Sequence, residues 1–203
     1  YLVDIDGRIV HSWQTTNYPG LMAYLLEDGH LLRAAAIAPD IDPVWNNAIG
    51  GGGRIEEYDW DGNLTWSFRY SDALNHQHHD FKKLPNGNVL FITWTYKSPT
   101  EAIDAGRDPG RTSIGGFWPD AIIEVRPTGP TTGDIAWEWH VWDHLVQDFD
   151  PAKANYGVVA DHPELFDINA ITDDGQSDFN HFNGVEYNPA LDQIMISSRR
   201  FNE

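Results

Sequence analysis

A turn followed by an apolar strand occurs three times along the chain, and this repeat constrains the fold more than any other feature. The copies cover residues 26–32, 84–91 and 187–196. In the second copy, a Pro-Asn-Gly-Asn sequence predicts a tight reversal, and the apolar residues after it suit a buried strand. The chain therefore reads as a repetitive all-β protein.

A second unit alternates with the first. Residues 1–13 predict a hairpin with an Asp-Gly turn, and the same pattern returns at residues 61–68 and 133–139. The first two hairpin turns lie about 55 residues apart, a period typical of propellers and solenoids. Four short strands per repeat, with aromatic residues at fixed places, favour a β-propeller.

Two segments interrupt the third repeat, at about residues 97–118 and 142–178. The first reads as a loop, and the second predicts short helical turns over residues 143–147 and 161–165. Insertions of this kind usually lie on one rim of a propeller and cover its mouth. Because both ends of the chain fall next to strand-like patterns, we expect residues 1–203 to form a single, incomplete propeller domain.

The charge of the chain limits its partners. The formal net charge is −18 and the pI is about 4.6, so the surface repels nucleic acid and anionic lipid. No apolar run is long enough to span a membrane, no signal peptide is present, and the chain contains no cysteine. We expect neither nucleic acid nor a membrane as a partner. An open propeller would expose sheet edges, so two copies could pair as a homodimer.

Histidines precede the repeated turn in two of its copies. His78, His79 and Asp80 stand before the second copy, and His181 and Asn183 stand before the third. When the two copies are aligned, His181 falls on His78 and Asn183 falls on Asp80. Equivalent positions of successive propeller repeats converge on the central channel, which predicts a polar site there. The alternative is that these side chains only close the end of a strand with hydrogen bonds.

Two arginines follow the strand of the third copy. Arg199 and Arg200 would bind an oxyanion through the planar guanidinium group, although strand alternation lets only one of them face the channel. The alternative for the other is a salt bridge to one of the many carboxylates. Four aromatic residues would line an aromatic-ring pocket or pack in the core: Trp94, Trp118, Trp142 and Phe182.

A metal site is a further alternative. The histidines of the second copy, with Asp80 and either His140 or His144, would supply ligands. Their spacing matches no known metal motif, and imidazoles near an arginine suit an anion better than a cation. We therefore assign no metal ligand.

Several of these motifs resemble the bacterial aryl-sulfate sulfotransferases. The resemblance rests on His-His-Asp-Phe before Leu-Pro-Asn-Gly-Asn, on the Trp-Glu-Trp-His run at residue 137, and above all on residues 178–183 with 188–199. It implies a six-bladed propeller, exported to the periplasm or secreted, that moves a sulfuryl group from an aryl sulfate to a phenol. The family uses a transiently sulfated histidine and needs no cofactor.

The resemblance also implies roles for individual residues. Arg199 would hold the sulfonate oxygens, and His181 and Asn183 would donate hydrogen bonds to the transferred group. His78 would act as acid or base toward the phenol, with support from His79, Asp80 and Arg200. The family's nucleophilic histidine lies in a later blade, so we expect it beyond residue 203.

Two rival functions stay open at this point. One is a non-catalytic secreted propeller that binds a ligand or a partner protein and uses its histidines structurally. The other is a metal-dependent hydrolase or lyase. Phenol-dependent turnover without metal distinguishes the sulfotransferase from both.

Overall fold

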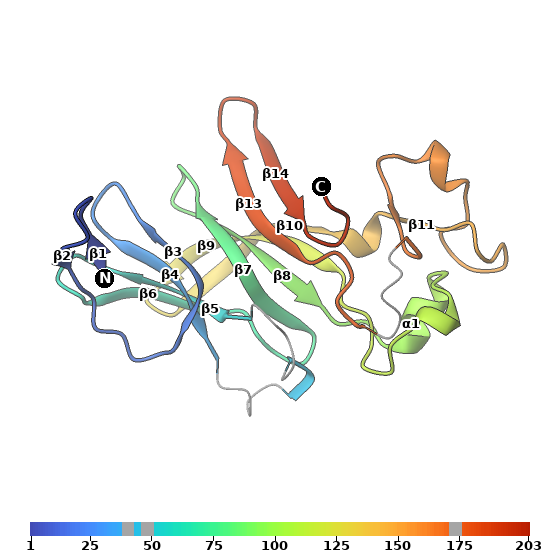
Figure 1. The fold of residues 1–203 in the computed structure, drawn as a ribbon, viewed down its shortest axis with the longest axis horizontal. Helices are drawn as coiled ribbons and strands as arrows, with labels where there is room; N and C mark the ends of the chain where they lie inside the picture. The colour runs from blue at the N-terminus through green and yellow to red at the C-terminus, as the bar shows by residue number, and fades with distance from the viewer. Residues whose placement is uncertain (38–42, 46–50, 171–175) are drawn as a thin grey trace.

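The computed structural model describes residues 1–37, 43–45, 51–170 and 176–203 and is almost entirely β-structure (Figure 1). Two four-stranded antiparallel sheets, each with its strands in sequence order, make up most of it. The first sheet contains β3 (Pro19–Leu25), β4 (Leu31–Ala36), β5 (Gly53–Tyr58) and β6 (Leu64–Arg69). The second contains β7 (Asn75–Lys83), β8 (Val89–Thr95), β9 (Asp120–Gly129) and β10 (Thr132–His140).

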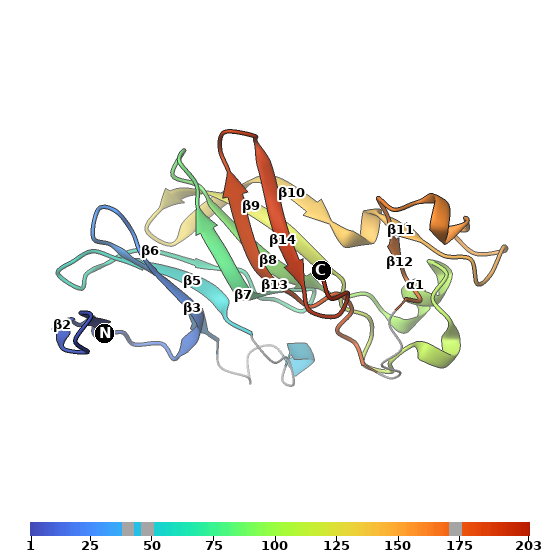
Figure 2. The ribbon, with the colours of Figure 1, turned by 45° about the horizontal axis from the view of Figure 1, so that its top comes forward.

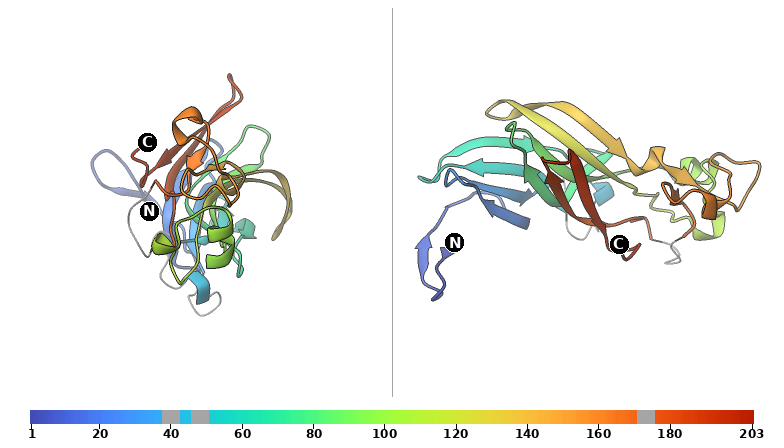
Figure 3. Two further views of the ribbon diagram at one scale, coloured as in Figure 1. Left: turned by 90° about the vertical axis from the view of Figure 1, so that its right-hand side faces the viewer. Right: turned by 90° about the horizontal axis from the view of Figure 1, so that it is seen from above.

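Three two-stranded sheets complete the described part of the fold. The N-terminal hairpin and the C-terminal hairpin are antiparallel, and the third pair is parallel. Their strands are β1 (Leu2–Val3) with β2 (Ile9–His11), β13 (Phe182–Asn188) with β14 (Gln193–Ser198), and β11 (Leu145–Val146) with β12 (Phe166–Asp167). Seen from above in Figure 3, the β1–β2 hairpin projects from one end of the molecule.

The two repeating units predicted from the sequence are the two halves of each four-stranded sheet. The turn-and-strand unit forms β3–β4, β7–β8 and β13–β14, and the Asp-Gly hairpin unit forms β1–β2 and β5–β6, with β9–β10 as the third copy. The glycines of four turns adopt positive φ, as tight reversals require: Gly7, Gly29, Gly62 and Gly87. The prediction of alternating hairpins is confirmed.

The second sheet lies between two hydrophobic clusters. Phe81, Phe91 and Ile123 pack toward the first sheet, whereas Leu90 and Ile122 pack toward β13–β14 and the inserted segments. Strands β8 and β9 are thus covered on both faces, which explains the uninterrupted apolar runs at residues 89–92 and 121–123. The sequence-based expectation of a buried strand after the second turn is confirmed.

The inserted segments lie at the far end from the N-terminal hairpin (Figures 1 and 2). The first contains a short helix, α1 (Pro99–Asp104), which begins with a capping box formed by Ser98 and Glu101. The expected helical turn over residues 143–147 is instead strand β11, preceded by a 3-10 turn. The 3-10 turns are η1 (Pro43–Trp45), η2 (Pro109–Arg111), η3 (Val141–Asp143) and η4 (Val159–Asp161). Residues 171–175 of the second insertion lie outside the described residues.

Candidate active site

Strand β7 carries a bulge at the histidine cluster. Gln77 pairs with Thr93 and Phe81 pairs with Phe91, so the three residues between Gln77 and Phe81 face a single residue of β8. His79 within this bulge has a φ of +48°, a left-handed conformation that is uncommon for a residue with a side chain. The bulge breaks the strict alternation of the strand and sends His78 and His79 to different environments.

His78 lies inside the protein, with none of its surface exposed. Its Nε2 is 2.7 Å from Oδ1 of Asp120, the first residue of β9, and its Nδ1 is 2.9 Å from Nδ1 of His79. The imidazole also stacks on Trp94, with ring centroids 3.7 Å apart. Burial lowers the pKa of His78 to about 3, so the ring is neutral near pH 7.

His79, rather than His78, lines a pocket together with His181. Their ring centroids are 4.7 Å apart, and His181 also has a left-handed backbone, with a φ of +54°. Burial, followed by the charges of His78 and His181, lowers the pKa of His79 to about 4. The structure therefore pairs His181 with His79 at the pocket, although the repeat alignment pairs it with His78.

Asp178 contacts His181, the second histidine of the pocket. Its Oδ2 is 2.5 Å from Nδ1 of His181 and 3.5 Å from Nε of Arg200, while its Oδ1 accepts a hydrogen bond from Nε1 of Trp94 at 3.1 Å. Burial opposes ionisation of Asp178, but the hydrogen bond and charge of His181 and the charge of Arg200 outweigh it and lower the pKa of the carboxyl. Because Nδ1 of His181 contacts Asp178, its Nε2 is left for the pocket.

The pocket has a volume of about 710 Å³ and collects basic side chains. These are His79, His181, Arg199 and Arg200. Asp178 is the one acidic residue in the described lining. Residues 113–115 and 176–178 also contribute to the wall, so both inserted segments border this pocket. In a protein with a net charge of −18, two arginines at one pocket suit an anion.

The two remaining predicted residues also border the pocket. Asn183 is exposed, and its Oδ1 accepts a hydrogen bond from Oγ of Ser197 at 2.7 Å. Arg199 is exposed and follows β14 in a turn, and its backbone N–H donates to the carbonyl of His181. Strand alternation does not apply after Ser198, which is why Arg199 and Arg200 both line the pocket.

Asp80 connects three strands. Its Oδ1 accepts hydrogen bonds from the Tyr24 hydroxyl at 2.6 Å and from its own neighbour Phe81, and its Oδ2 accepts the backbone N–H of Val185 at 3.0 Å. Burial, together with the hydrogen bond and charge of Asp80, raises the pKa of Tyr24. These contacts join the first sheet, the second sheet and β13.

Replacing Tyr24 with phenylalanine should lower the free energy of unfolding by about 1–2 kcal/mol, because the charged acceptor on Asp80 loses a buried donor. Urea denaturation measures this change. The matched control is Tyr187→Phe, which removes an exposed hydroxyl bound to Asp192 and should change the same quantity by less than about 0.5 kcal/mol. Equal effects of the two substitutions would contradict a structural role for Asp80.

The four aromatic residues divide between the pocket and the core. Trp94 and Trp118 line the pocket and pack with Trp45. Phe182 is buried in the cluster between the second sheet and β13, and Trp142 packs against the same cluster. The aromatic wall beside the cationic side chains thus comes from two tryptophans.

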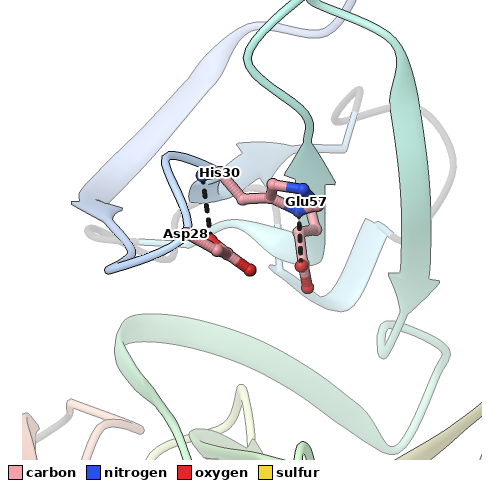
Figure 4. Close-up of side chains that lie close together, drawn as sticks. All are labelled: Asp28, His30 and Glu57. Atoms are coloured by element: carbon pink, nitrogen blue, oxygen red, sulfur yellow. Dashed lines mark hydrogen bonds and ion pairs between the residues drawn. The ribbon is translucent and has the colours of Figure 1, made fainter.

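A group of metal-type ligands lies away from this pocket, in the first sheet (Figure 4). Asp28, His30 and Glu57 are the only described residues that bring three such ligand atoms within 4.8 Å of one another. Nδ1 of His30 is 3.0 Å from Oε1 of Glu57, and the Lys83 ammonium pairs with Oε2 at 2.5 Å. The lysine supplies the positive charge, so the group forms an ion-pair network.

The histidines expected to complete a metal site with the second repeat lie elsewhere. Nε2 of His144 accepts a hydrogen bond from Trp139, and its Nδ1 lies 2.9 Å from the carbonyl of His140. His140 itself is 3.3 Å from a carboxylate oxygen of Glu138. Among the described residues, no metal-type group includes the histidines of the bulge.

Sequence reasoning did not select Asp120 or Asp178, although each backs a histidine of the cluster. Asp178 stands three residues before His181, a spacing that a reading of the third repeat could have detected. Asp120 is 42 residues from His78 in the sequence, and only the pairing of β7, β8 and β9 brings the two together.

Along the part of the chain that the structure describes, no helix is both long and apolar enough to cross a membrane.

Comparison with known families gives one match. A family model described as Arylsulfotransferase (ASST) matches residues 1–202. Searches of curated proteins and of solved structures found no significant match. The match extends over nearly the entire chain and includes both repeats that carry the pocket histidines. The chain therefore belongs to the arylsulfotransferase family.

Proposed function

We propose that this protein transfers a sulfuryl group from a phenolic sulfate ester to a phenol in two steps, through a sulfated histidine. The observation that carries the proposal is the pocket itself. Two histidines and two arginines gather beside Trp94 and Trp118 in a chain of the arylsulfotransferase family. An aryl sulfate has a planar ring and an anionic group, which match the aromatic and cationic walls.

Each pocket side chain has a role in this proposal. The exposed guanidinium of Arg199 binds the sulfonate oxygens, and Arg200 adds charge from the Asp178 side of the pocket. His181 presents Nε2 to the transferred group, because its Nδ1–H donates to the Asp178 carboxylate. Sulfuryl transfer resembles phosphoryl transfer, in which positioning and stabilisation of the equatorial oxygens supply most of the catalysis.

The side chain of Asn183 completes this set. Its Oδ1 accepts the Ser197 hydroxyl, which leaves the amide N–H₂ as the donor available to the transferred group. His79 lies against His181 and serves as acid or base toward the phenol, with His78 behind it. We propose that the sulfated histidine itself lies in a later repeat.

The proposal extends to architecture, location and assembly. We propose that the two four-stranded sheets and the β13–β14 hairpin are successive blades of a six-bladed propeller, in a protein that acts in the periplasm or outside the cell. Leu21, Leu25 and Met195 expose apolar surface on strands β3 and β14. Such surface supports pairing with further blades or with a second copy in a homodimer.

Release of 4-nitrophenol from 4-nitrophenyl sulfate tests the activity in the full-length protein. We expect release to accelerate when phenol is added, and initial-rate plots at several phenol concentrations to give the parallel lines of ping-pong kinetics. A chelator should leave the rate unchanged. If 4-nitrophenol is released only at the uncatalysed rate while the protein still binds the ester, sulfuryl transfer is contradicted and a non-catalytic binding protein is favoured.

A further inference from the structure

The buried side of the pocket contains a chain of three ionisable groups. Oδ1 of Asp120 is 2.7 Å from Nε2 of His78, and Nδ1 of His78 is 2.9 Å from Nδ1 of His79. Asp120 and His78 are fully enclosed, whereas His79 lies on the pocket wall. Hydrogen bonds therefore run without interruption from an enclosed carboxylate to the pocket.

A second contact of Asp120 fixes where its proton can be. Oδ2 accepts the backbone N–H of Phe182 at 3.0 Å, so a proton on this carboxyl must be carried by Oδ1, which faces His78. Since two imidazole nitrogens lie 2.9 Å apart, one of them carries a proton and the other does not. The protonation state of Asp120 therefore determines which ring nitrogen of His78 and of His79 carries the proton.

Two arrangements follow. With Asp120 ionised, His78 donates to it from Nε2 and accepts from His79 at Nδ1, so Nε2 of His79 is unprotonated. With Asp120 protonated, the donor and the acceptor of each hydrogen bond exchange roles, and Nε2 of His79 carries a proton. We propose that Asp120, His78 and His79 form a proton relay that switches Nε2 of His79 between acceptor and donor.

The electrostatics of the site support such a relay. Burial and the charge of Asp178 raise the pKa of Asp120 well above its ordinary value, which makes this carboxylate a better proton acceptor than an exposed aspartate. Burial also keeps His78 uncharged. The other ionisable groups around the relay are Asp178, His181 and Asp80, with the two arginines of the pocket beyond them.

The relay rests on the proposed function for its substrate, and its protons balance over one cycle. As the acceptor phenol forms its bond to sulfur and the S–N bond of sulfohistidine breaks, the phenol proton moves to Nε2 of His79. The Nδ1 proton of His79 moves to His78, and the Nε2 proton of His78 moves to Asp120. In the donor half-reaction the S–N bond forms, the S–O bond breaks, and the same movements run backwards to protonate the leaving phenolate.

Nitrogen NMR of ¹⁵N-histidine-labelled full-length protein tests the relay without any need for turnover. At the alkaline end of a pH titration, once Asp120 has ionised, we expect Nε2 of His79 to be unprotonated. In Asp120→Asn, the amide oxygen must accept the Phe182 N–H, so the amide N–H₂ donates to His78 and Nε2 of His79 should carry a proton. The matched control is Asp80→Asn, which alters the other carboxylate that accepts an N–H of β13 and should leave the His79 tautomer as in the wild type.

A second measurement uses the activity. Asp120→Asn should lower kcat/KM for phenyl sulfate at least about 10-fold more than for 4-nitrophenyl sulfate. The amide cannot release the proton that must replace the one leaving His79, and the poorer leaving group depends most on that transfer. The same His79 tautomer in Asp120→Asn and in the wild type at the alkaline end of a pH titration, or an equal loss with both esters, would overturn the relay. If Asp120→Asn does not fold, absence of a His79 tautomer change with pH in the wild type overturns it. Wild-type protein that transfers no sulfuryl group, yet shows the tautomer change, would contradict the proposed function alone.

Discussion

Replacing His181 with alanine is expected to lower kcat/KM for 4-nitrophenyl sulfate by about 100- to 10,000-fold. His181 faces the pocket through Nε2 while its Nδ1 is bonded to Asp178, so its removal deletes a side chain that contacts the transferred group. It also removes the imidazole that Asp178 binds. Steady-state release of 4-nitrophenol by the full-length variant measures the loss.

A histidine outside the pocket provides the control. His162 pairs with Glu164 in the second inserted segment, and its alanine variant should retain activity within about two-fold. Circular dichroism and thermal unfolding separate loss of activity from loss of folding. An active His181→Ala variant would remove His181 from the mechanism and leave the pocket as a binding site.

The fold was predictable where local chemistry decides it. Gly29 and Gly87 mark turns that need positive φ, and the apolar residues after each turn form strands that are buried in the structure. The helix α1 was also readable, because Ser98, Pro99 and Glu101 form a capping box with proline at the first helical position. The loop expected over residues 97–118 overlooked that signal.

The strand β11 could not be predicted in the same way. Leu145 and Val146 pair with Phe166 and Asp167 as a parallel bridge across about twenty residues. A two-residue strand carries too little periodicity to be distinguished from a helical turn. Pairing with a distant segment, rather than local preference, decides its conformation.

The structure places one predicted residue differently from the repeat alignment. Repeat alignment selected His78, but the bulge in β7 places His79 at the pocket and His78 behind it. A bulge adds a residue to one strand, so a pattern based on strict alternation shifts there. Asp120 carries no signal of its own, because its partner His78 is brought close only by the pairing of three strands.

The second large effect is expected for Asp178→Asn. Trp94 donates to Oδ1 of Asp178, so the amide oxygen of the variant should stay there and the amide N–H₂ should face Nδ1 of His181. Nδ1 must then accept a hydrogen bond, so the tautomer that the carboxylate fixes is lost and the ring proton moves to Nε2. An equivalent change in hydrolases with a carboxylate–imidazole pair costs about 10,000-fold. Because His181 still presents Nε2 to the pocket in the variant, we expect a smaller loss of about 100-fold in kcat/KM.

Two measurements distinguish a tautomer change at His181 from other causes of lost activity. Nitrogen NMR should show that Nδ1 of His181 loses its proton in Asp178→Asn, a change that simple loosening of the pocket would not produce. Gln176→Ala removes the side-chain acceptor of the Arg200 Nη2 group and leaves the Asp178–His181 pair intact. If Gln176→Ala lowers activity as much as Asp178→Asn does, the carboxylate acts through Arg200. If only Asp178→Asn does so, and the tautomer of His181 changes with it, Asp178 acts by fixing the tautomer and orientation of the imidazole.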